Sequence, residues 1–327
     1  MPVANGLPPS KSGLRTNGSR FIKSPILPAA MLVLAQSLVS PAEPAALEKY
    51  RDIPWRHLET IAGMGPRNPG SPGYQKLKEY ILQIGRQFAD SVVEQPFTHR
   101  APGREPLALT NIEMRFNGGG PPVLIGAHYD TRPFADEEPD PALRAIPIPG
   151  VNDGGSGTAV LLALARLLHD RKPKQPVHLV FFDGEDYGAK GSAQYLLGST
   201  HYARRLKKED NNRWPRAVLV IDMVGDRDLQ IYKEGHSVKS APWLVNLIGR
   251  VARKNDAFPQ FKKKTKYTLL DDHYPFILRG IPSVLLIDFD YPAWHTRADT
   301  LEQCSSESLF AVFSVVAGTL AELHAFD

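Results

Sequence analysis

The sequence has little cysteine and no long apolar run, and each shortage excludes a class of protein. Cys304 is the only cysteine among 327 residues, which excludes an intrachain disulfide, a four-thiolate zinc site and an iron–sulfur cluster. No apolar stretch approaches the ~18 residues of a membrane-spanning helix, so we expect no stable membrane span. The net charge of +4 is too dilute over this length to indicate a nucleic-acid partner.

Acidic residues are also missing from the beginning of the chain. Residues 1–24 contain four basic residues and no acidic one, and a short apolar run over residues 25–39 precedes the small residues of SPAEPAA. A basic flank, a short apolar centre and a small-residue exit are typical of a secretory signal peptide. We therefore expect residues 1–40 to be a signal peptide or disordered leader, the protein to be exported (periplasmic or secreted), and residues 41–327 to form a single domain.

The rest of the chain alternates between two kinds of apolar pattern. Runs rich in β-branched or aromatic residues predict strands over 111–116, 122–127, 177–182, 217–223 and 282–287. Helical spacing of apolar residues predicts helices over 45–62, 74–88, 157–168, 189–197, 242–254 and 307–324. Apolar strands that alternate with helices favour an α/β fold with a largely parallel sheet buried on both faces. Ligands of such sheets bind beyond the carboxyl ends of the strands.

Polar side chains suited to metal binding follow four of the expected strands. They are the acidic and imidazole residues His128, Asp130, Asp183, Glu185, Asp186, Asp222 and His295, together with Asp153 at the start of a helix. Carboxylates and imidazoles without thiolates suit a catalytic zinc ion that keeps one position open for substrate. Several carboxylates crowded in one crevice repel one another, and a divalent cation compensates for that repulsion.

Single residues of this set also have simpler interpretations. Asp153 alone is typical of a helix N-cap, and His295 alone is typical of a packed or surface imidazole. The adjacent pair Glu185–Asp186 is more informative, because neighbouring residues in extended chain point in opposite directions. A turn at Gly184 then allows one carboxylate to bind metal while the other serves as general acid and base.

The order of the motifs HYD, GVNDGGSG, FFDGED, IDMVGD, DDHYPF and WHT resembles the zinc aminopeptidase superfamily. This resemblance runs from about residue 67 to 311 and implies a three-layer α/β/α sandwich around a mostly parallel mixed sheet. Within the superfamily, the chain is most similar to the glutaminyl cyclases. Asp271 stands where plain aminopeptidases usually have serine, Trp294 immediately precedes His295, and FFDGE matches the cyclase motif. Asp186 stands where animal cyclases carry glutamate.

The resemblance implies a zinc-dependent acyltransferase, a glutaminyl-peptide cyclotransferase. It would convert the N-terminal glutamine of peptides or proteins to pyroglutamate and release ammonia, with one Zn²⁺ per chain. Carried over by position, the implied site comprises the zinc ligands Asp153, Asp186 and His295, the proton shuttle Glu185, the hydrogen-bonding carboxylates Asp222 and Asp271, and the pocket wall Trp294.

Two other functions remain open from the sequence. A two-zinc aminopeptidase would hold a second metal on His128 and Asp222, with Asp153 bridging, and Glu185 would then activate water. A non-catalytic, partner-binding ectodomain would have inherited the fold alone, and it predicts eroded ligands, of which there are none. The acidic segment 136–140 lies in a long loop and is either a rim or lid of the crevice or, as we favour, a solvated insertion. We interpret the basic residues 262–264 as a solvated loop or helix exit. No sequence pattern indicates the oligomeric state.

Overall fold

The computed structural model describes residues 44–325 except residues 104, 189–191, 193 and 258. The expected leader lies outside the described residues, which belong to one compact unit of the chain, Val39–Asp327. The helices are α1 (Pro44–Leu47), η1 (Glu48–Tyr50), α2 (Ile53–Ala62), α3 (Pro72–Phe88), η2 (Pro141–Leu143), α4 (Gly155–Asp170), α5 (Leu197–Arg205), α6 (Gly235–Ser240), α7 (Pro242–Lys254), α8 (Tyr274–Ile277), η3 (Leu301–Gln303) and α9 (Ser306–Glu322). The strands are β1 (Ser91–His99), β2 (Leu107–Phe116), β3 (Val123–His128), β4 (Val177–Phe182), β5 (Ala217–Asp222), β6 (Ile231–Lys233), β7 (Phe261–Thr265) and β8 (Ser283–Ile287).

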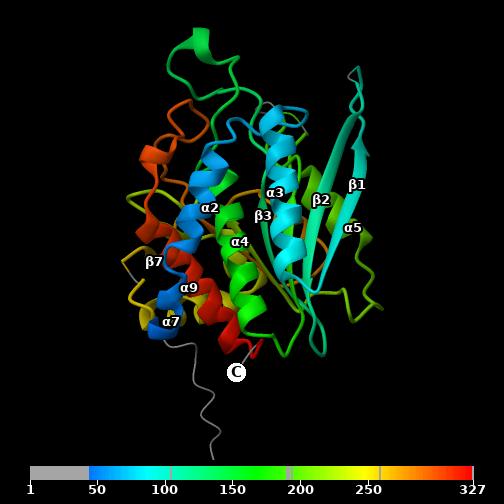
Figure 1. Ribbon diagram of the computed structural model, residues 1–327, viewed down its shortest axis with the longest axis vertical. Helices are drawn as coiled ribbons and strands as arrows, with labels where there is room; N and C mark the ends of the chain where they lie inside the picture. The colour runs from blue at the N-terminus through cyan, green and yellow to red at the C-terminus, as the bar shows by residue number, and fades with distance from the viewer. Residues whose placement is uncertain (1–43, 104, 189–191, 193, 258, 326–327) are drawn as a thin grey trace, which may run out of the picture. The chain divides into compact units, whose positions relative to one another are not determined.

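Six strands form a mixed sheet in the order β1-β2-β4-β3-β5-β8 (Figure 1). Strands β4, β3, β5 and β8 are parallel to one another, while β2 is antiparallel to β4 and β1 is antiparallel to β2. All residues of the four parallel strands are buried, as expected of a sheet covered on both faces. Strands β6 and β7 form a separate two-stranded parallel sheet.

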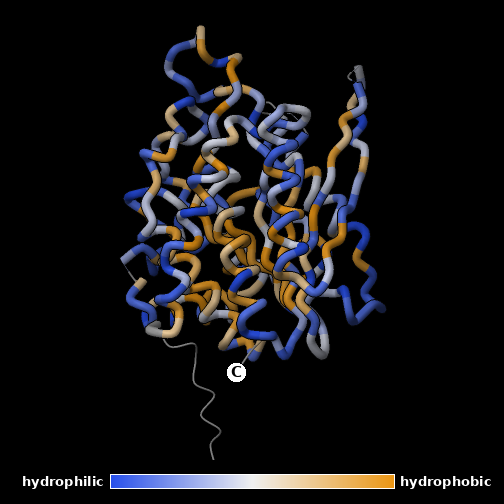
Figure 2. The backbone as a smooth tube through the Cα atoms, viewed as in Figure 1, coloured by the Kyte–Doolittle hydropathy of each residue, from blue (hydrophilic) through white to orange (hydrophobic). Residues whose placement is uncertain are grey.

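Alternate residues of the central strands enter two different apolar cores. On β4, Leu179 and Phe181 pack into the larger core, whereas Val180 and Phe182 pack into the smaller one. Helices α2, α3, α4 and α9 lie together on the larger-core face in Figure 1, and residues of α5 and α8 contribute to the smaller core. Figure 2 shows hydrophobic residues concentrated along α4 and the central strands. The architecture confirms the predicted three-layer α/β/α sandwich with a mixed sheet.

Several element predictions were wrong in detail. The helix expected over 45–62 is divided into α1, η1 and α2, because Pro54 takes the first turn of a new helix. The helix expected over 189–197 is wrong for the described residues, because α5 begins at Leu197. The sheet also contains β1, an edge strand with Pro96 in its middle, which the sequence patterns did not indicate. The lysines at 262–264 belong to strand β7 rather than to a loop.

Candidate metal centre and active site

The predicted site residues come together because the parallel strands end at one edge of the sheet. His128 is the last residue of β3 and Asp222 is the last residue of β5. Asp183 immediately follows β4, which pairs with β3 in parallel. His295 arrives from the loop after β8, the parallel neighbour of β5. Fold topology alone therefore gathers groups as distant in sequence as His128 and His295.

Five of these residues form two metal-type clusters that share Asp153. The groups His128, Asp153, Asp222 and Asp153, Asp186, His295 each offer ligand atoms within 4.8 Å of one another. His128 Nε2 lies 3.2 Å from Asp153 Oδ1 and 3.0 Å from Asp222 Oδ1. His295 Nε2 lies 3.6 Å from Asp153 Oδ2 and 3.3 Å from Asp186 Oδ2. All five residues are buried, and Asp186 Oδ2 has no hydrogen-bond partner among the residues that the structure describes. An imidazole with carboxylate oxygens in this arrangement fits zinc, and the clusters offer room for one ion or two.

The N-cap interpretation of Asp153 does not apply. The N-cap residue of helix α4 is Gly154, whose φ of 76° is left-handed, and within the described part of the chain its N-terminus has no side-chain cap. Instead, the carboxylate of Asp299 accepts hydrogen bonds from the backbone N–H groups of Asn152 (2.8 Å) and Asp153 (3.0 Å). Asp299 therefore holds the backbone of Asn152 and Asp153 in place. The side chain of Asp153 faces His128 and His295.

The Glu185–Asp186 turn has the predicted form. Gly184 has a φ of 67°, and a Cβ at this position would lie 2.8 Å from Leu109 Cδ1. Asp130 accepts hydrogen bonds from the backbone N–H groups of Glu185 (3.1 Å) and Asp186 (3.3 Å). A residue with a side chain would therefore be strained at Gly184, and the buried Asp130 carboxylate fixes the turn that presents both acidic side chains.

Arg132 is a site residue that the sequence patterns did not indicate. Its guanidinium group is buried and donates to both oxygens of Asp136, at 2.8 and 2.7 Å, and to Asp186 Oδ1. A third partner is the Tyr195 hydroxyl, which accepts a hydrogen bond of 3.1 Å from Arg132. Arg132 therefore fixes the Asp186 oxygen that faces away from His295 and leaves Oδ2 directed at the cluster. Such outer partners orient metal ligands.

Asp136 corrects the interpretation of residues 136–140 as a solvated loop. Pro139 and Asp140, at the end of that segment, are exposed, as a solvated loop requires. Asp136, however, turns inward and lies 3.3 Å from His295 Nδ1. Burial alone raises the pKa of Asp136, but contacts with His295 and Arg132 outweigh burial and hold the pKa well below its ordinary value. A carboxylate behind a ligand histidine fixes which ring nitrogen faces the metal.

The remaining predicted site residues, Glu185, Asp271 and Trp294, line a cavity of about 170 Å³ together with members of both clusters. Glu185, Asp222 and Asp271 supply its charged walls, and its apolar walls include Leu269, Ile287, Phe289 and Trp294. The Trp294 ring stacks on His295 with the ring centroids 4.0 Å apart. His295 has a left-handed φ of 55°, an uncommon conformation that directs its ring into the cluster. A neighbouring cavity of about 490 Å³ shares the Glu185, Trp294 and His295 walls.

Burial dominates the protonation of the carboxylates in this cavity. It raises the pKa of Glu185 well above the ordinary range, with Asp186, Asp272 and Asp271 adding repulsion and His128 opposing the rise. The pKa of Asp271 is raised for the same reason, with a further contribution from Asp222. Among the described residues, Asp222 contacts His128, and Asp271 accepts a hydrogen bond from the backbone N–H group of Asp272. A cation at the clusters would lower both pKa values again.

Comparisons with known proteins agree with this geometry. A model described as peptidase family M28 matches residues 111–320. A glutaminyl-peptide cyclotransferase of Drosophila melanogaster is 25% identical over 290 residues, which cover 79% of each chain. The crystal structure of a Tannerella forsythia glutaminyl cyclase superposes with a TM-score of 0.78 at 31% identity, over 83% of this chain and 98% of that chain.

A protein named as a peptidase is similar to nearly the same degree. The structure of a Zn-dependent exopeptidase from Parabacteroides distasonis superposes with a TM-score of 0.77 at 28% identity, over 82% of this chain and 96% of that chain. These matches confirm the resemblance to the zinc aminopeptidase superfamily. Since the family model spans more than half of the chain, this protein belongs to peptidase family M28.

Proposed function

We propose that this protein is a glutaminyl-peptide cyclotransferase that converts N-terminal glutamine to pyroglutamate and releases ammonia. The observation that carries the proposal is the position of Asp271. This buried carboxylate shares a small cavity with Glu185, Asp222 and Trp294, next to the metal-type clusters. Similarity to the glutaminyl cyclase of Tannerella forsythia supports the same reaction.

An N-terminal glutamine brings both reacting groups with it. Its α-amine forms a bond to the γ-carbonyl carbon, the bond from that carbon to the amide nitrogen breaks, and ammonia leaves. In our assignment, Glu185 accepts the proton lost by the amine and returns it to the departing nitrogen. Burial raises the pKa of Glu185 in the metal-free protein, and a cation at the clusters would lower that pKa again, toward the range in which the carboxylate can accept a proton and return it. Asp153, Asp186 and His295 would hold a zinc ion, and the chemistry that it would supply when bound is that of a Lewis acid.

The remaining walls of the cavity favour cyclisation over hydrolysis. Trp294 and Phe289 pack edge to face with ring centroids 5.0 Å apart, and Leu269 and Ile287 complete the apolar lining. A narrow apolar wall confines the glutamine side chain in a folded conformation that brings its amine to its amide. Asp222 and Asp271 are placed to accept hydrogen bonds from the amide as its nitrogen departs.

A two-zinc aminopeptidase is the second candidate, and one observation favours it. The ligand atoms of His128, Asp153 and Asp222 lie within 4.8 Å of one another, as do those of the cluster that contains His295, so this chain has candidate ligands for a second ion. In that reaction Glu185 would take its proton from water, and a peptide bond would break. One zinc ion per purified chain supports the cyclase, and two support the peptidase.

The proposal is tested by replacing Asp271 with asparagine. The variant Asp271→Asn keeps the size of the side chain and removes its charge. Asp271 belongs to neither metal-type cluster, so zinc content should stay unchanged. We expect kcat for a glutamine-initiated peptide to fall roughly 100-fold, because the departing amide loses a charged acceptor. Undiminished cyclisation in this variant would contradict the role given to Asp271.

We also infer that residues 1–40 form a cleaved export signal, so that the mature enzyme is periplasmic or secreted. The basic flank and short apolar run of the leader support this inference. Within the part of the chain that the structure describes, no helix is both long and apolar enough to cross a membrane. N-terminal sequencing of protein recovered from an exporting host should find a mature terminus near residue 40. An intact Met1 on exported protein would contradict cleavage.

A further inference from the structure

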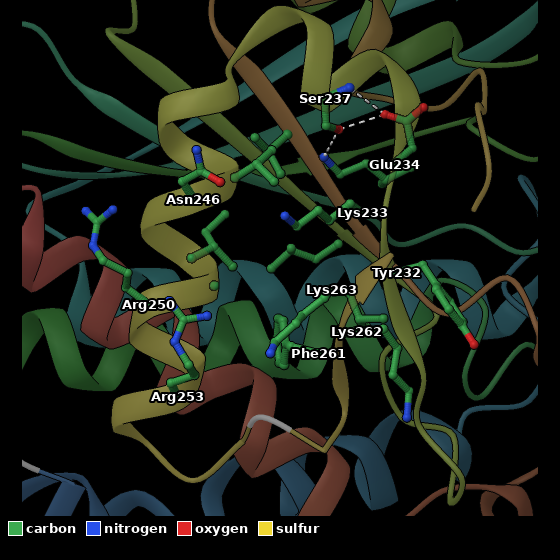
Figure 3. A pocket seen from close by; sticks show the side chains of 17 residues that line it. Tyr232, Lys233, Glu234, Ser237, Asn246, Arg250, Arg253, Phe261, Lys262 and Lys263 are labelled. Carbon is green, nitrogen blue, oxygen red and sulfur yellow. Dashed lines mark hydrogen bonds between the residues drawn. The ribbon is translucent and has the colours of Figure 1, made fainter. Parts of the chain in front are cut away.

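A second cavity lies between helix α7 and strands β6, β7 and β8 (Figure 3). Its volume is about 350 Å³, within the range of small-molecule sites. It shares no lining residue with the two cavities at the metal-type clusters. The proposed reaction at the metal-type clusters therefore does not account for this second cavity.

The floor of this α7 cavity is apolar. It is formed by buried side chains of two sheets and one helix, namely Ile231, Val245, Ile248, Phe261, Val284 and Leu286. A floor of this kind provides a favourable environment for a hydrocarbon group, because binding there removes apolar surface from water.

The rim of the α7 cavity is strongly cationic. Figure 3 shows Lys233, Arg253 and Lys263 extending toward the same space from α7 and from the β6–β7 sheet, and Arg250 and Lys262 also line the cavity. The one acidic residue in the lining is Glu234. Its carboxylate accepts hydrogen bonds from the backbone N–H groups of His236 and Ser237 and lies 3.1 Å from His273 Nε2, so it is engaged within the protein. The excess of positive charge at the opening of the cavity therefore favours the binding of an anion.

Gly249 is the third observation, because it keeps one wall of the cavity open. It lies inside the 13-residue helix α7, where glycine destabilises a helix relative to alanine. Its φ is not left-handed, so no backbone conformation requires glycine. A Cβ would meet only the end of the Arg253 side chain, at 3.9 Å, so no close packing requires glycine either. A glycine that weakens its helix and borders an open cavity is explained by a ligand that occupies the space.

From these three observations we propose that the α7 cavity binds a small organic anion with an apolar tail, of which a medium-chain fatty acid is the simplest example. The tail lies on the apolar floor beside Gly249, and the anionic head lies at the cationic rim, where Lys233 binds it. This site is separate from the proposed cyclisation site, so binding is measured directly rather than through turnover.

Isothermal titration of the full chain with three eight-carbon ligands tests the chemical class. Octanoate should bind saturably with a Kd below about 1 mM. Octan-1-ol and octylammonium, which keep the tail and remove or reverse the charge, should bind about tenfold more weakly or worse. Acetate, which keeps only the head, should show no saturable binding. Octylammonium or octan-1-ol binding as tightly as octanoate would overturn the proposal, as would the absence of octanoate binding.

Two pairs of variants locate the site. Gly249→Leu fills the space beside α7 and should abolish octanoate binding, whereas Gly249→Ala adds one methyl group and should retain most of it. Both substitutions favour helix, so thermal unfolding should show that neither variant is less stable than the parent. Lys233→Met should weaken octanoate roughly five- to tenfold. Lys239→Met removes the same charge from α6, outside the lining, and should have no effect. Unchanged binding in a folded Gly249→Leu protein would place octanoate elsewhere and overturn the proposal.

Discussion

At the scale of single residues, the site depends on which partners each carboxylate has. Glu185 and Asp186 are neighbours in sequence, yet Asp186 is held by Arg132 and faces His295, while Glu185 lies in neither metal-type cluster and lines both cavities beside them. The same functional group is thus assigned to metal binding in one residue and to proton transfer in the other. The division follows from the turn at Gly184 and from the anchor that Asp130 provides.

This division predicts the outcome of Glu185→Gln. The amide keeps the size of the carboxyl group but cannot accept the proton of the attacking amine. We expect kcat to fall by ~10²–10⁴-fold, while zinc content and thermal unfolding stay as in the parent protein, because Glu185 is in neither metal-type cluster. Activity retained in this variant would show that another group serves as the base.

Arg132 predicts a change in metal affinity without a change in ligands. Lysine in its place keeps the charge but cannot form the paired bonds to Asp136 and reach Asp186 as well. In competition with a chelator, Arg132→Lys should bind zinc ~10–100-fold more weakly. Arg144→Lys is a matched control, since Arg144 is an exposed residue of the same loop. Equal zinc affinities in the two variants would contradict this role.

Sequence reasoning found the site residues that adjoin strands and missed those that depend on distant partners. His128 and Asp222 end buried apolar strands, so the pattern that predicts the strand also places the ligand. Arg132 and Asp136 lie in a loop without such a pattern, and their roles arise from contacts with Asp186 and His295, more than 50 residues away. The segment GAHYDTR offered one signal, an arginine close to a carboxylate cluster.

At the scale of elements, the same distinction separates the strands. Runs that are apolar throughout, such as β4 and β5, were predicted because both of their faces are buried. Strand β1 alternates between exposed and half-buried residues, and β7 carries three lysines, so neither shows an apolar run. Strand β1 is stabilised by pairing with β2, and β7 by pairing with β6. The hydrophobic pattern within each strand cannot predict such tertiary pairing.

The contact between strands β2 and β4 predicts a pH dependence of stability. Burial raises the pKa of Glu113, but hydrogen bonds from His178 and Arg115 outweigh burial and lower the pKa to about 2. Because the folded-state pKa is depressed, the charged Glu113 stabilises the fold fully above its ordinary pKa near 4.5, and this contribution is lost as pH falls toward 2. The shift corresponds to roughly 3 kcal/mol at neutral pH.

The test compares Glu113→Gln with the parent protein by denaturant unfolding at several pH values. The difference in unfolding free energy should be largest near neutral pH and should shrink by about half at pH 3. The exposed residue Glu59 provides the control, since Glu59→Gln should show no such trend. A difference that stays constant between neutral pH and pH 3 would contradict the assignment.

At the scale of the whole molecule, metal binding and protonation are linked. Burial lowers the pKa of His295, but Asp186 and Asp136, followed by Asp153, outweigh burial and raise it to about 9 in the metal-free protein. Zinc binds the neutral imidazole, so binding near neutral pH must release a proton. Apparent zinc affinity should therefore increase as pH rises toward 9, and calorimetry in buffers of different ionisation enthalpy should detect the released proton. An affinity that does not change between pH 6 and pH 8 would contradict this linkage.

The central claim is that a fold shared with peptidases carries out cyclisation here, and product analysis tests it most directly. The zinc-loaded protein is incubated with one peptide that begins with glutamine and a matched peptide that begins with leucine, and the products are weighed by mass spectrometry. Our account predicts loss of ammonia from the glutamine peptide and no change in the leucine peptide. Release of free leucine, with no loss of ammonia from the glutamine peptide, would contradict it.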